Sequence, residues 1–265
     1  MCIRDRWIAS LPFGRHAAAK RAEWSYWLQS RWVDTILAAM RGLFGLTFEI
    51  KNQEVVSPGP VIVLFRHVSI MDNLLPHAFV SAPEGLRLRW VLKKELLRDP
   101  ALDIGGNRMP NYFVDRDSDD PETERTNVRN LGADMGPEDG VLLFPEGTRF
   151  SKARRERYMD RLAQSSPELH QVMASYEHIL PPRTGGVLAL LDHGADVVLG
   201  AHAGFEDLRG IKEIWSRAPV GRTIRLSFRR ISQADIPVDT DERKRWLFDA
   251  WAWVGAEVEA MRPPA

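Results

Sequence analysis

Two short apolar runs stand out along the chain, and both are bounded by residues that break regular structure. The run VIVLF at residues 61–65 follows the segment SPGP, and the run VLLF at residues 141–144 follows the segment GPEDG. Continuous apolar runs of this length are typical of strands that are covered on both faces of a sheet. We predict buried strands at both places, and shorter strands at residues 90–92 and 112–114.

Apolar residues at helical spacing mark longer segments around these strands. The predicted helices are residues 72–80, 121–134, 153–163, 166–176 and 240–260. The last one has a start signal in Asp239, Thr240 and Glu242. Its predicted buried residues are Trp246, Leu247, Ala250, Trp253 and Val254. Strands that alternate with helices predict an α/β domain, in which the polar segment 115–125 is a surface loop.

Residues 24–46 form an amphipathic segment that is rich in tryptophan. Their apolar residues recur at helical spacing: Trp24, Trp27, Leu28, Trp32, Ile36, Leu37, Met40, Leu43 and Phe44. A helix with tryptophan on one face and scattered arginines suits a membrane interface. A helix that packs on the core of its own domain has the same pattern, so the periodicity by itself leaves both interpretations open.

The composition is that of a folded domain. The 265 residues are 44% hydrophobic and 27% charged, with 36 Lys+Arg against 36 Asp+Glu. This balance excludes an intrinsically disordered chain and lacks the basic excess expected of a dedicated nucleic-acid binder. The single cysteine, Cys2, cannot form an internal disulfide or supply a zinc-finger cage. No apolar run of about eighteen residues is free of charge, so no standard transmembrane helix is predicted.

The zero net charge is an average over two unlike parts. Residues 1–51 carry eight basic and four acidic side chains, hence a net charge of +4, so the remaining residues carry −4. The first part also holds four of the nine tryptophans. We therefore divide the chain into N-terminal amphipathic helices at residues 1–50 and a second domain at residues 51–265. The opening hexapeptide, MCIRDR, resembles the translated adapter fragments of some metagenomic gene models, in which case the natural start and any anchor it carries are missing.

The first candidate for chemistry is FRHVSIMD at residues 65–72, where His67 follows the predicted strand and Asp72 comes five residues later. On a continuous helix these side chains would point about 140° apart. They can pair if His67 ends the strand and the chain turns before Asp72 begins a helix, at the place where α/β sheets carry reactive groups. A histidine held by a carboxylate is a good general base. The alternative is structural, because Ser69 and Asp72 also fit a capping box.

The second candidate is FPEGTRFS at residues 144–151, after the second buried strand. Gly147 lets a ligand approach the backbone closely, and Arg149 offers a planar fork that matches phosphate oxygens. A Pro-Glu-Gly turn with an exposed arginine is the plain alternative. Neither candidate is specific by itself.

Together, the two segments resemble the glycerolipid acyltransferase family, which contains the 1-acylglycerol-3-phosphate acyltransferases and their lysophospholipid relatives. Two more segments fit in order: YFVDR at residues 112–116 resembles the second family block, and ILPPRTGG at residues 179–186 resembles the fourth block in its lysocardiolipin and long-chain form. The segment KKEL at residues 93–96 is similar to a family segment between the first two blocks. The similarity covers about residues 24–260. It implies a single α/β domain with a mixed central sheet flanked by helices, preceded by an N-terminal amphipathic membrane clamp.

The resemblance also implies an activity. The expected enzyme is an O-acyltransferase that moves a fatty acyl group from acyl-CoA, or from acyl carrier protein, to the free hydroxyl of a lysophospholipid. The first-choice acceptor is 1-acyl-sn-glycerol 3-phosphate, which would give phosphatidic acid. In the His-x4-Asp motif, His67 is the implied general base and Asp72 orients it. The implied location is the bilayer surface, at the cytoplasmic face of the bacterial inner membrane.

The same resemblance assigns the remaining site residues. The implied acceptor-binding residues are Lys93, Arg116, Glu146, Gly147, Thr148 and Arg149, and the fourth block contributes Pro181 and Pro182. No cofactor, metal or nucleic acid is expected, and the acyl-CoA or acyl carrier protein enters as a co-substrate. His193, Asp196 and His202 lack the spacing of a known metal site, and the glycines at 194, 200 and 204 suggest loops or strand ends around them.

Several alternatives stay open at the level of the sequence. The residues between His67 and Asp72 are unusually apolar for the family. The basic run from Lys152 to Arg161 is either a solvated helix face or a contact for CoA phosphates or lipid head groups. The acceptor alternatives are lysophosphatidylglycerol, lysophosphatidylinositol and lysocardiolipin. A non-catalytic lipid-binding relative would keep the fold, whereas the lack of a Gly-x-Ser-x-Gly elbow argues against a serine hydrolase.

Overall fold

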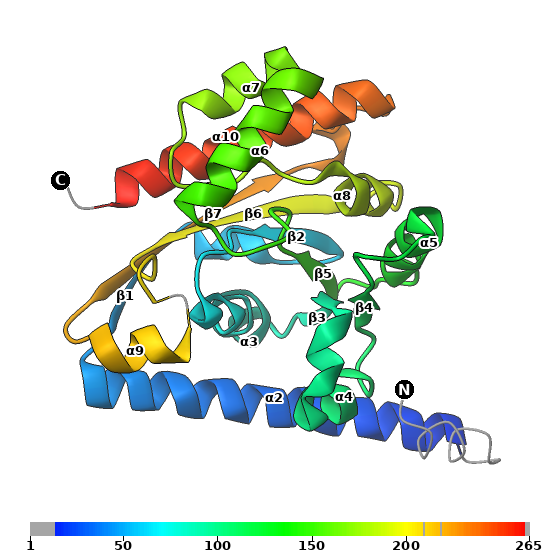
Figure 1. The fold of residues 1–265 in the computed structure, drawn as a ribbon. Coiled ribbons are helices and arrows are strands. Elements are labelled where there is room, and N and C mark those ends of the chain that lie inside the picture. Colours follow the sequence, from blue (N-terminus) through cyan, green and yellow to red (C-terminus); the bar gives the residue numbers. More distant parts are fainter. Residues whose placement is uncertain (1–13, 209, 218, 263–265) are drawn as a thin grey trace.

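The computed structural model describes residues 14–208, 210–217 and 219–262, and these residues form one mixed seven-stranded sheet with helices on both faces (Figure 1). The strand order is β1-β7-β6-β2-β5-β3-β4. The strands are β1 (Thr47–Lys51), β2 (Val61–Phe65), β3 (Arg87–Lys93), β4 (Tyr112–Val114), β5 (Asp139–Leu143), β6 (Asp196–Ala203) and β7 (Thr223–Ile231). Neighbouring strands are parallel except β6 and β7, which are antiparallel. The predicted fold class is confirmed.

The helices form two layers (Figure 1). The α-helices are α2 (Gly14–Phe44), α3 (Ala82–Glu84), α4 (Pro100–Gly106), α5 (Pro121–Leu131), α6 (Lys152–Ser165), α7 (Pro167–Ala174), α8 (Thr184–Leu191), α9 (Ile211–Arg217) and α10 (Thr240–Met261). The shorter turns are the 3-10 segments η1 (Gln53–Val56), η2 (Ile70–Asn73), η4 (Lys94–Arg98) and η5 (Gln233–Asp235), and the π-helical segment η3 (His77–Ser81). Helices α6, α7, α8 and α10 cover one face of the sheet, and α2 lies along the other.

The central strand β2 explains why two cores form. Successive side chains of a strand point to opposite faces. Ile62 and Leu64 accordingly pack in the core under α10, whereas Val61, Val63 and Phe65 pack in the core on the α2 side. All five side chains are fully buried, as predicted for an apolar run that is covered on both faces.

Most predicted elements are confirmed, with shifted ends. The buried strands are β2 and β5, and the two shorter candidates lie in β3 and β4. Helices α5, α6, α7 and α10 also lie where they were predicted. On α10, however, the fully buried tryptophan is Trp251, while Trp246 and Trp253 are only partly buried. The stretch 72–80 is helical, as predicted, but irregular: it holds the end of the 3-10 turn η2 and most of the π-helical turn η3.

The sequence pattern missed β1, β6 and β7. The expectation that Gly200 marks a loop or strand end is wrong, because Gly200 lies inside β6 and pairs with Phe65 of β2. A Cβ on Gly200 would overlap the Phe65 ring, so the glycine serves the close packing of these two strands. Gly194 and Gly204 do flank the strand.

Helix α2 is longer than predicted, and its apolar residues are divided between two faces. Val33, Leu37 and Met40 are buried against the domain, whereas Trp24, Trp27 and Trp32 are 68%, 52% and 59% exposed. The helix therefore has one apolar set that packs on the domain and a separate, exposed set of tryptophans. None of the described helices combines the length and the apolar character needed to cross a bilayer.

The two predicted parts of the chain meet inside the sheet. Strand β1 pairs with β7 from Thr47 onwards, so the sheet begins before the proposed boundary at residues 50 and 51. The hexapeptide MCIRDR, Cys2 and Trp7 lie outside the described residues.

Candidate active site

His67 and Asp72 are brought together by the turn after β2. Strand β2 ends at Phe65, and Ser69 caps the 3-10 segment η2 that contains Asp72. Nδ1 of His67 lies 3.2 Å from Oδ2 of Asp72. The same carboxylate oxygen accepts the backbone N–H of Ser69 at 2.7 Å and completes a capping box. The catalytic and the structural interpretation of this segment therefore describe one arrangement.

The arrangement sets the protonation of both groups. Burial by itself would raise the pKa of the Asp72 carboxyl, but the imidazole of His202 and the hydrogen bonds with His67 and Ser69 outweigh it and hold that pKa below its usual value. An ionised carboxylate only accepts hydrogen bonds, so Nδ1 of His67 carries the proton. The opposite ring nitrogen, Nε2, is then free to act as a base.

The His67 ring faces a cavity of about 440 Å³. It stacks on Phe144, with 4.4 Å between ring centroids, and its side chain keeps 17% of its surface exposed. The cavity is bounded by the ends of β2, β3, β4 and β5, which run parallel and therefore end at the same edge of the sheet.

Glu146 does not line this cavity. Its side chain is fully buried, and its two carboxyl oxygens accept the backbone N–H groups of His67 and Leu180, each at 3.2 Å. Burial raises the pKa of Glu146 to about 8, against the opposing effect of Arg66. The predicted place of Glu146 among the cavity-lining residues is therefore wrong, and its contacts join the turn after β5 to the segments around His67 and Leu180.

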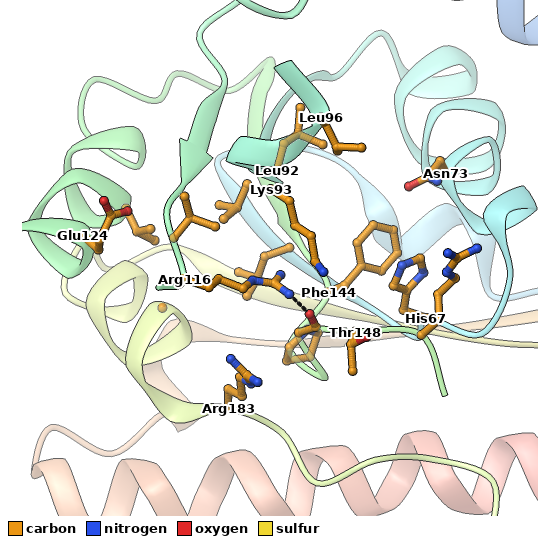
Figure 2. Close-up of a pocket in the computed structure, with 18 of the residues that line it drawn as sticks. His67, Asn73, Leu92, Lys93, Leu96, Arg116, Glu124, Phe144, Thr148 and Arg183 are labelled. Atoms are coloured by element: carbon orange, nitrogen blue, oxygen red, sulfur yellow. Dashed lines mark hydrogen bonds between the residues drawn. The ribbon is translucent and has the colours of Figure 1, made fainter. Parts of the chain in front are cut away.

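Gly147 has a geometric reason to be glycine. Its φ is +69°, and a Cβ would stand 2.8 Å from Cδ of Arg183. Gly147, Thr148 and Arg149, which are predicted to bind the acceptor, all line the cavity. The carbonyl of Gly147 accepts a hydrogen bond from the guanidinium of Arg116, which Figure 2 marks with a dashed line.

Cationic side chains crowd one part of the cavity. Lys93 comes from the end of β3 and Arg116 from the loop after β4, and both line the cavity. Arg154 of α6 and Arg183 also line it, although neither was singled out by itself from the sequence. Figure 2 shows Lys93 and Arg116 reaching into the space between His67 and Arg183. Arg183 stands in the fourth block and Arg154 in the basic run, so both segments carried a signal.

These cations are short of negative partners. In the described part of the chain, no ion pair within 4.0 Å joins a carboxylate to Lys93, Arg116, Arg154 or Arg183. Burial lowers the pKa of Lys93, and the nearby Arg116 lowers it further. Burial and Arg183 likewise lower the pKa of Arg116. Unpaired cations that repel one another in a concave site favour an anionic ligand.

The rest of the cavity is apolar. Its apolar lining consists of Ile70, Val91, Leu92, Leu96, Val114, Val128, Leu143 and Phe144. In Figure 2, Leu92 and Leu96 lie at the end away from Arg183, with His67 to one side between the two ends. The cavity therefore offers an apolar region and a cationic region to the same ligand, or to two ligands that meet at His67.

The two prolines of the fourth block lie behind the site, although Arg183 of the same block lines it. Pro181 and Pro182 are buried and outside the cavity. The carbonyl of Leu180 accepts the indole N–H of Trp251 at 3.0 Å, and the backbone N–H of Arg183 donates to the carbonyl of Pro145 at 2.8 Å. These bonds hold Arg183 beside the turn after β5.

The other polar candidates have separate surroundings. His193 contacts the carbonyl of Arg129 at 2.6 Å, Asp196 pairs with Arg230 at 2.7 Å, and His202 is buried beside Asp72. No group of three metal-ligating side chains occurs among the described residues. In the basic run of α6, Arg155 donates to the carbonyls of Met173 and Tyr176 near the end of α7, so part of the run is structural.

Comparisons with known proteins bear on the family and on the fold. The sequence model of the family described as Acyltransferase matches residues 47–198. The chain is 17% identical over 260 residues to "Lysophosphatidylinositol acyltransferase 10" of Caenorhabditis elegans, a match that covers 92% of this chain and 64% of that protein. The chain thus spans somewhat less than two thirds of that relative. The crystal structure of the 1-acyl-sn-glycerophosphate (LPA) acyltransferase PlsC from Thermotoga maritima shares the fold, with a TM-score of 0.55 and 14% identity over 98% of this chain and 89% of that one.

Proposed function

The chain belongs to the Acyltransferase family, and from that premise we propose that it acylates the free hydroxyl of a lysophospholipid, with 1-acyl-sn-glycerol 3-phosphate as the first-choice acceptor. The observation that carries the proposal is the position of His67. This histidine is held by a buried carboxylate and faces a cavity that is cationic at one end and apolar at the other. A phosphate-bearing acyl lipid has matching ends.

The proposed reaction is a direct transfer. Nε2 of His67 removes the proton from the acceptor hydroxyl, and the oxygen attacks the thioester carbonyl of the donor. The new C–O bond forms, the C–S bond breaks, and the proton passes from His67 to the leaving thiolate. General base catalysis of this kind contributes about 10²–10⁴-fold to the rate. Asp72 stabilises the imidazolium that forms in between.

The cationic part of the cavity suits the acceptor phosphate. In 1-acyl-sn-glycerol 3-phosphate, only C2, C3 and one ester oxygen separate the phosphate from the reacting oxygen. Lys93 and Arg116 reach toward the space beside His67, so they are the proposed primary phosphate ligands (Figure 2). Arg149 and the turn residues Gly147 and Thr148 complete the proposed phosphate-binding part of the cavity. Charge-assisted hydrogen bonds both bind and orient such a group.

The donor is proposed to be acyl-CoA or acyl carrier protein, with no cofactor. Both donors present the thioester on a phosphopantetheine arm, which also carries negative charge. Arg154 and Arg183 add two cations to those already assigned to the acceptor, so the cavity has positive charge left for a donor phosphate. The apolar lining around Leu92 and Leu96 is the proposed place for the acyl chain.

The proposed location is the surface of a bilayer, at the cytoplasmic face of the inner membrane of a bacterium. The tryptophans of α2 support it, because tryptophan favours the membrane interface and each of these side chains is more than half exposed. Helix α4, which follows Leu96 in the chain, lies on the α2 side of the molecule (Figure 1). The apolar end of the cavity is therefore on the same side as the proposed membrane contact.

Another lysophospholipid is the second candidate acceptor. The Caenorhabditis elegans relative is named for lysophosphatidylinositol, and lysophosphatidylglycerol and lysocardiolipin present the same phosphate chemistry. A non-catalytic lipid-binding role is disfavoured, because the His67–Asp72 pair is intact and faces the cavity.

The test is an acyl-transfer assay on the purified chain with these lysophospholipids, acyl-CoA and acyl carrier protein, using mass spectrometry to detect the product. We expect phosphatidic acid from 1-acylglycerol 3-phosphate, and a loss of about 10²-fold or more in His67→Ala. His170→Ala, on α7 and outside the cavity lining, is the control that should stay active. Wild-type turnover in His67→Ala would overturn the mechanism, and activity on another lysophospholipid alone would overturn the acceptor.

A further inference from the structure

The two oxygens of the Asp72 carboxylate have very different surroundings. Oδ2 interacts with His67 Nδ1 and accepts the backbone N–H groups of Val68 and Ser69. Oδ1 is equally buried, yet no hydrogen-bond donor among the described residues is bonded to it. Burying a carboxylate oxygen without a hydrogen-bond donor costs free energy. A polar group that faces Oδ1 therefore affects whether the carboxylate of Asp72 stays ionised.

His202 of β6 faces this oxygen from the neighbouring strand. Its Nε2 lies 3.5 Å from Oδ1 of Asp72 and 3.1 Å from the carbonyl oxygen of Arg66. The ring is fully buried and stacks on Phe65, with 5.4 Å between centroids and an interplanar angle of 18°. At 3.5 Å the approach to Asp72 is an electrostatic contact and longer than a normal hydrogen bond.

The surroundings determine where the His202 proton lies. Both groups that face Nε2 are acceptors, and Nδ1 has no hydrogen-bond partner among the described residues. The proton therefore sits on Nε2, and the positive end of the N–H dipole points between Arg66 and Asp72. Burial lowers the pKa of His202, and Arg66 lowers it further, so the ring is neutral near neutral pH despite Asp72 and Glu206 nearby.

We propose that His202 is a positioning residue for the His67–Asp72 pair: its Nε2–H stabilises the otherwise unpartnered Oδ1 and keeps the carboxylate ionised and aligned with His67. The inference rests on the proposed function of His67. The other ionisable groups around Asp72 and His202 are Arg66, which pairs with Glu206 at 2.9 Å, and the buried Glu146. These groups make hydrogen bonds of their own. Nε of Arg66 is buried without a partner, but among the described residues no ion pair within 4.0 Å joins Arg66 to Asp72, which leaves Oδ1 to His202.

Two variants separate positioning from packing. His202→Leu removes the N–H, whereas His202→Gln keeps an amide N–H near the position of Nε2. His77→Leu is the matched control, because His77 is also buried, carries an unpartnered Nε2 and lies outside the cavity lining. All three variants are checked for folding by thermal unfolding before any other measurement.

The decisive readout is the ¹⁵N NMR titration of the His67 ring in the full chain without substrate. Loss of the His202 N–H leaves the charge of Asp72 less compensated, so Asp72 holds the His67 imidazolium more strongly. We expect the titration midpoint of His67 to move to higher pH in His202→Leu, to return toward wild type in His202→Gln, and to stay unchanged in His77→Leu. A midpoint unchanged in His202→Leu, or shifted equally in His77→Leu, overturns the proposal.

Steady-state kinetics is the second readout. In His202→Leu the acid limb of the kcat/KM profile should move to higher pH, with kcat lower by about 2- to 10-fold and KM unchanged, as expected for one weak hydrogen bond. A change in KM alone would contradict a positioning role. The NMR titration needs no acyl transfer, so it tests His202 independently of the activity. A wrong acceptor would show in the acyl-transfer assay, and a wrong general base would show as wild-type turnover in His67→Ala.

Discussion

Oδ2 of Asp72 lies 3.2 Å from His67 Nδ1 and also accepts the backbone N–H of Ser69, so one buried carboxylate both orients the imidazole and closes the turn that presents it. Catalysis and local stability are therefore linked at this residue. Substitutions that remove the charge and substitutions that remove the cap should have different consequences.

Asp72→Asn keeps a side-chain oxygen that can cap the turn and removes the negative charge. We expect turnover to fall by about 10²-fold or more, with a small change in stability, because the amide oxygen of asparagine can still accept the backbone N–H groups that the carboxylate of Asp72 accepts in the capping box. Asp72→Ala should lose activity and also about 1–3 kcal/mol of unfolding free energy, because buried N–H groups lose their acceptor. Steady-state kinetics and urea unfolding measure the two effects. Equal unfolding free energies for Asn and Ala would contradict the capping role.

Glu146 is expected to affect stability and its pH dependence, and to leave acceptor binding unchanged. Its pKa of about 8 in the folded chain lies above the ordinary value of about 4.3. The folded state therefore binds an extra proton between these values, and the stability that the neutral carboxyl contributes is lost as pH rises from about 4.3 through 8. Urea unfolding at several pH values should show this decline in the wild type.

The control for this prediction is Glu146→Gln, which cannot ionise. The unfolding free energy of this variant should fall less between about pH 4.3 and pH 8 than that of the wild type, because residue 146 no longer titrates. Its KM for the acceptor should match the wild type, because residue 146 lies outside the cavity lining. A large rise in KM in the Gln variant would place Glu146 in contact with substrate and contradict the geometry.

Arg116 and Arg183 are expected to contribute binding energy for anionic ligands. Arg183→Gln should raise the KM of a phosphate-bearing substrate by about 10-fold or more, since a hydrogen bond to a charged group is worth about 1.5–3 kcal/mol. Arg116→Gln should do the same for the acceptor. The control is Arg157→Gln, because Arg157 lies on exposed α6 surface and bonds only within its own helix. Comparing acyl-CoA with an acyl-pantetheine that lacks phosphate tells which substrate Arg183 contacts.

The exposed tryptophan face of α2 is expected to bind membranes. Replacing Trp24, Trp27 and Trp32 by serine should lower co-sedimentation with anionic vesicles by about 10-fold or more, because each buried tryptophan contributes a large apolar area. The unfolding free energy should hardly change, since these side chains are largely exposed. Val220 and Val238, which are 68% and 86% exposed, provide a control double serine variant. Unaltered vesicle binding by the triple variant would rule out this face as the membrane contact.

Gly200 is expected to be intolerant of any side chain. Gly200→Ala should lower the unfolding free energy by about 1–3 kcal/mol, because its Cβ would overlap the Phe65 ring in the packed sheet. Phe65 in turn stacks on His202, so turnover should fall as well. Gly105→Ala is the control, since a Cβ at Gly105 of α4 meets nothing within 4 Å and alanine favours a helix. Thermal unfolding of both variants checks the contrast.

Local pattern was enough for the elements that support the site. Strands β2 and β5 were predictable because a short continuous apolar run between breakers is typical of a strand that is buried on both faces. Helix α10 was predictable because its start signal and its apolar periodicity agree. The antiparallel pair β6–β7 was missed because its residues include glycines, serines and arginines whose places depend on neighbouring strands. The 3-10 turn η2 was missed because its geometry follows from the contacts of Asp72 and Ser69.

The sequence by itself determined the family and the two buried strands, and it predicted the site residues His67, Asp72, Lys93, Arg116 and Arg149, because each depends on short contiguous segments. Only the tertiary structure decided which face of α2 is covered, that Glu146 is buried behind the cavity, and that His202 stands beside Asp72. Periodicity tells which residues share a face, but what covers that face depends on strand order and on packing between residues that are distant along the chain.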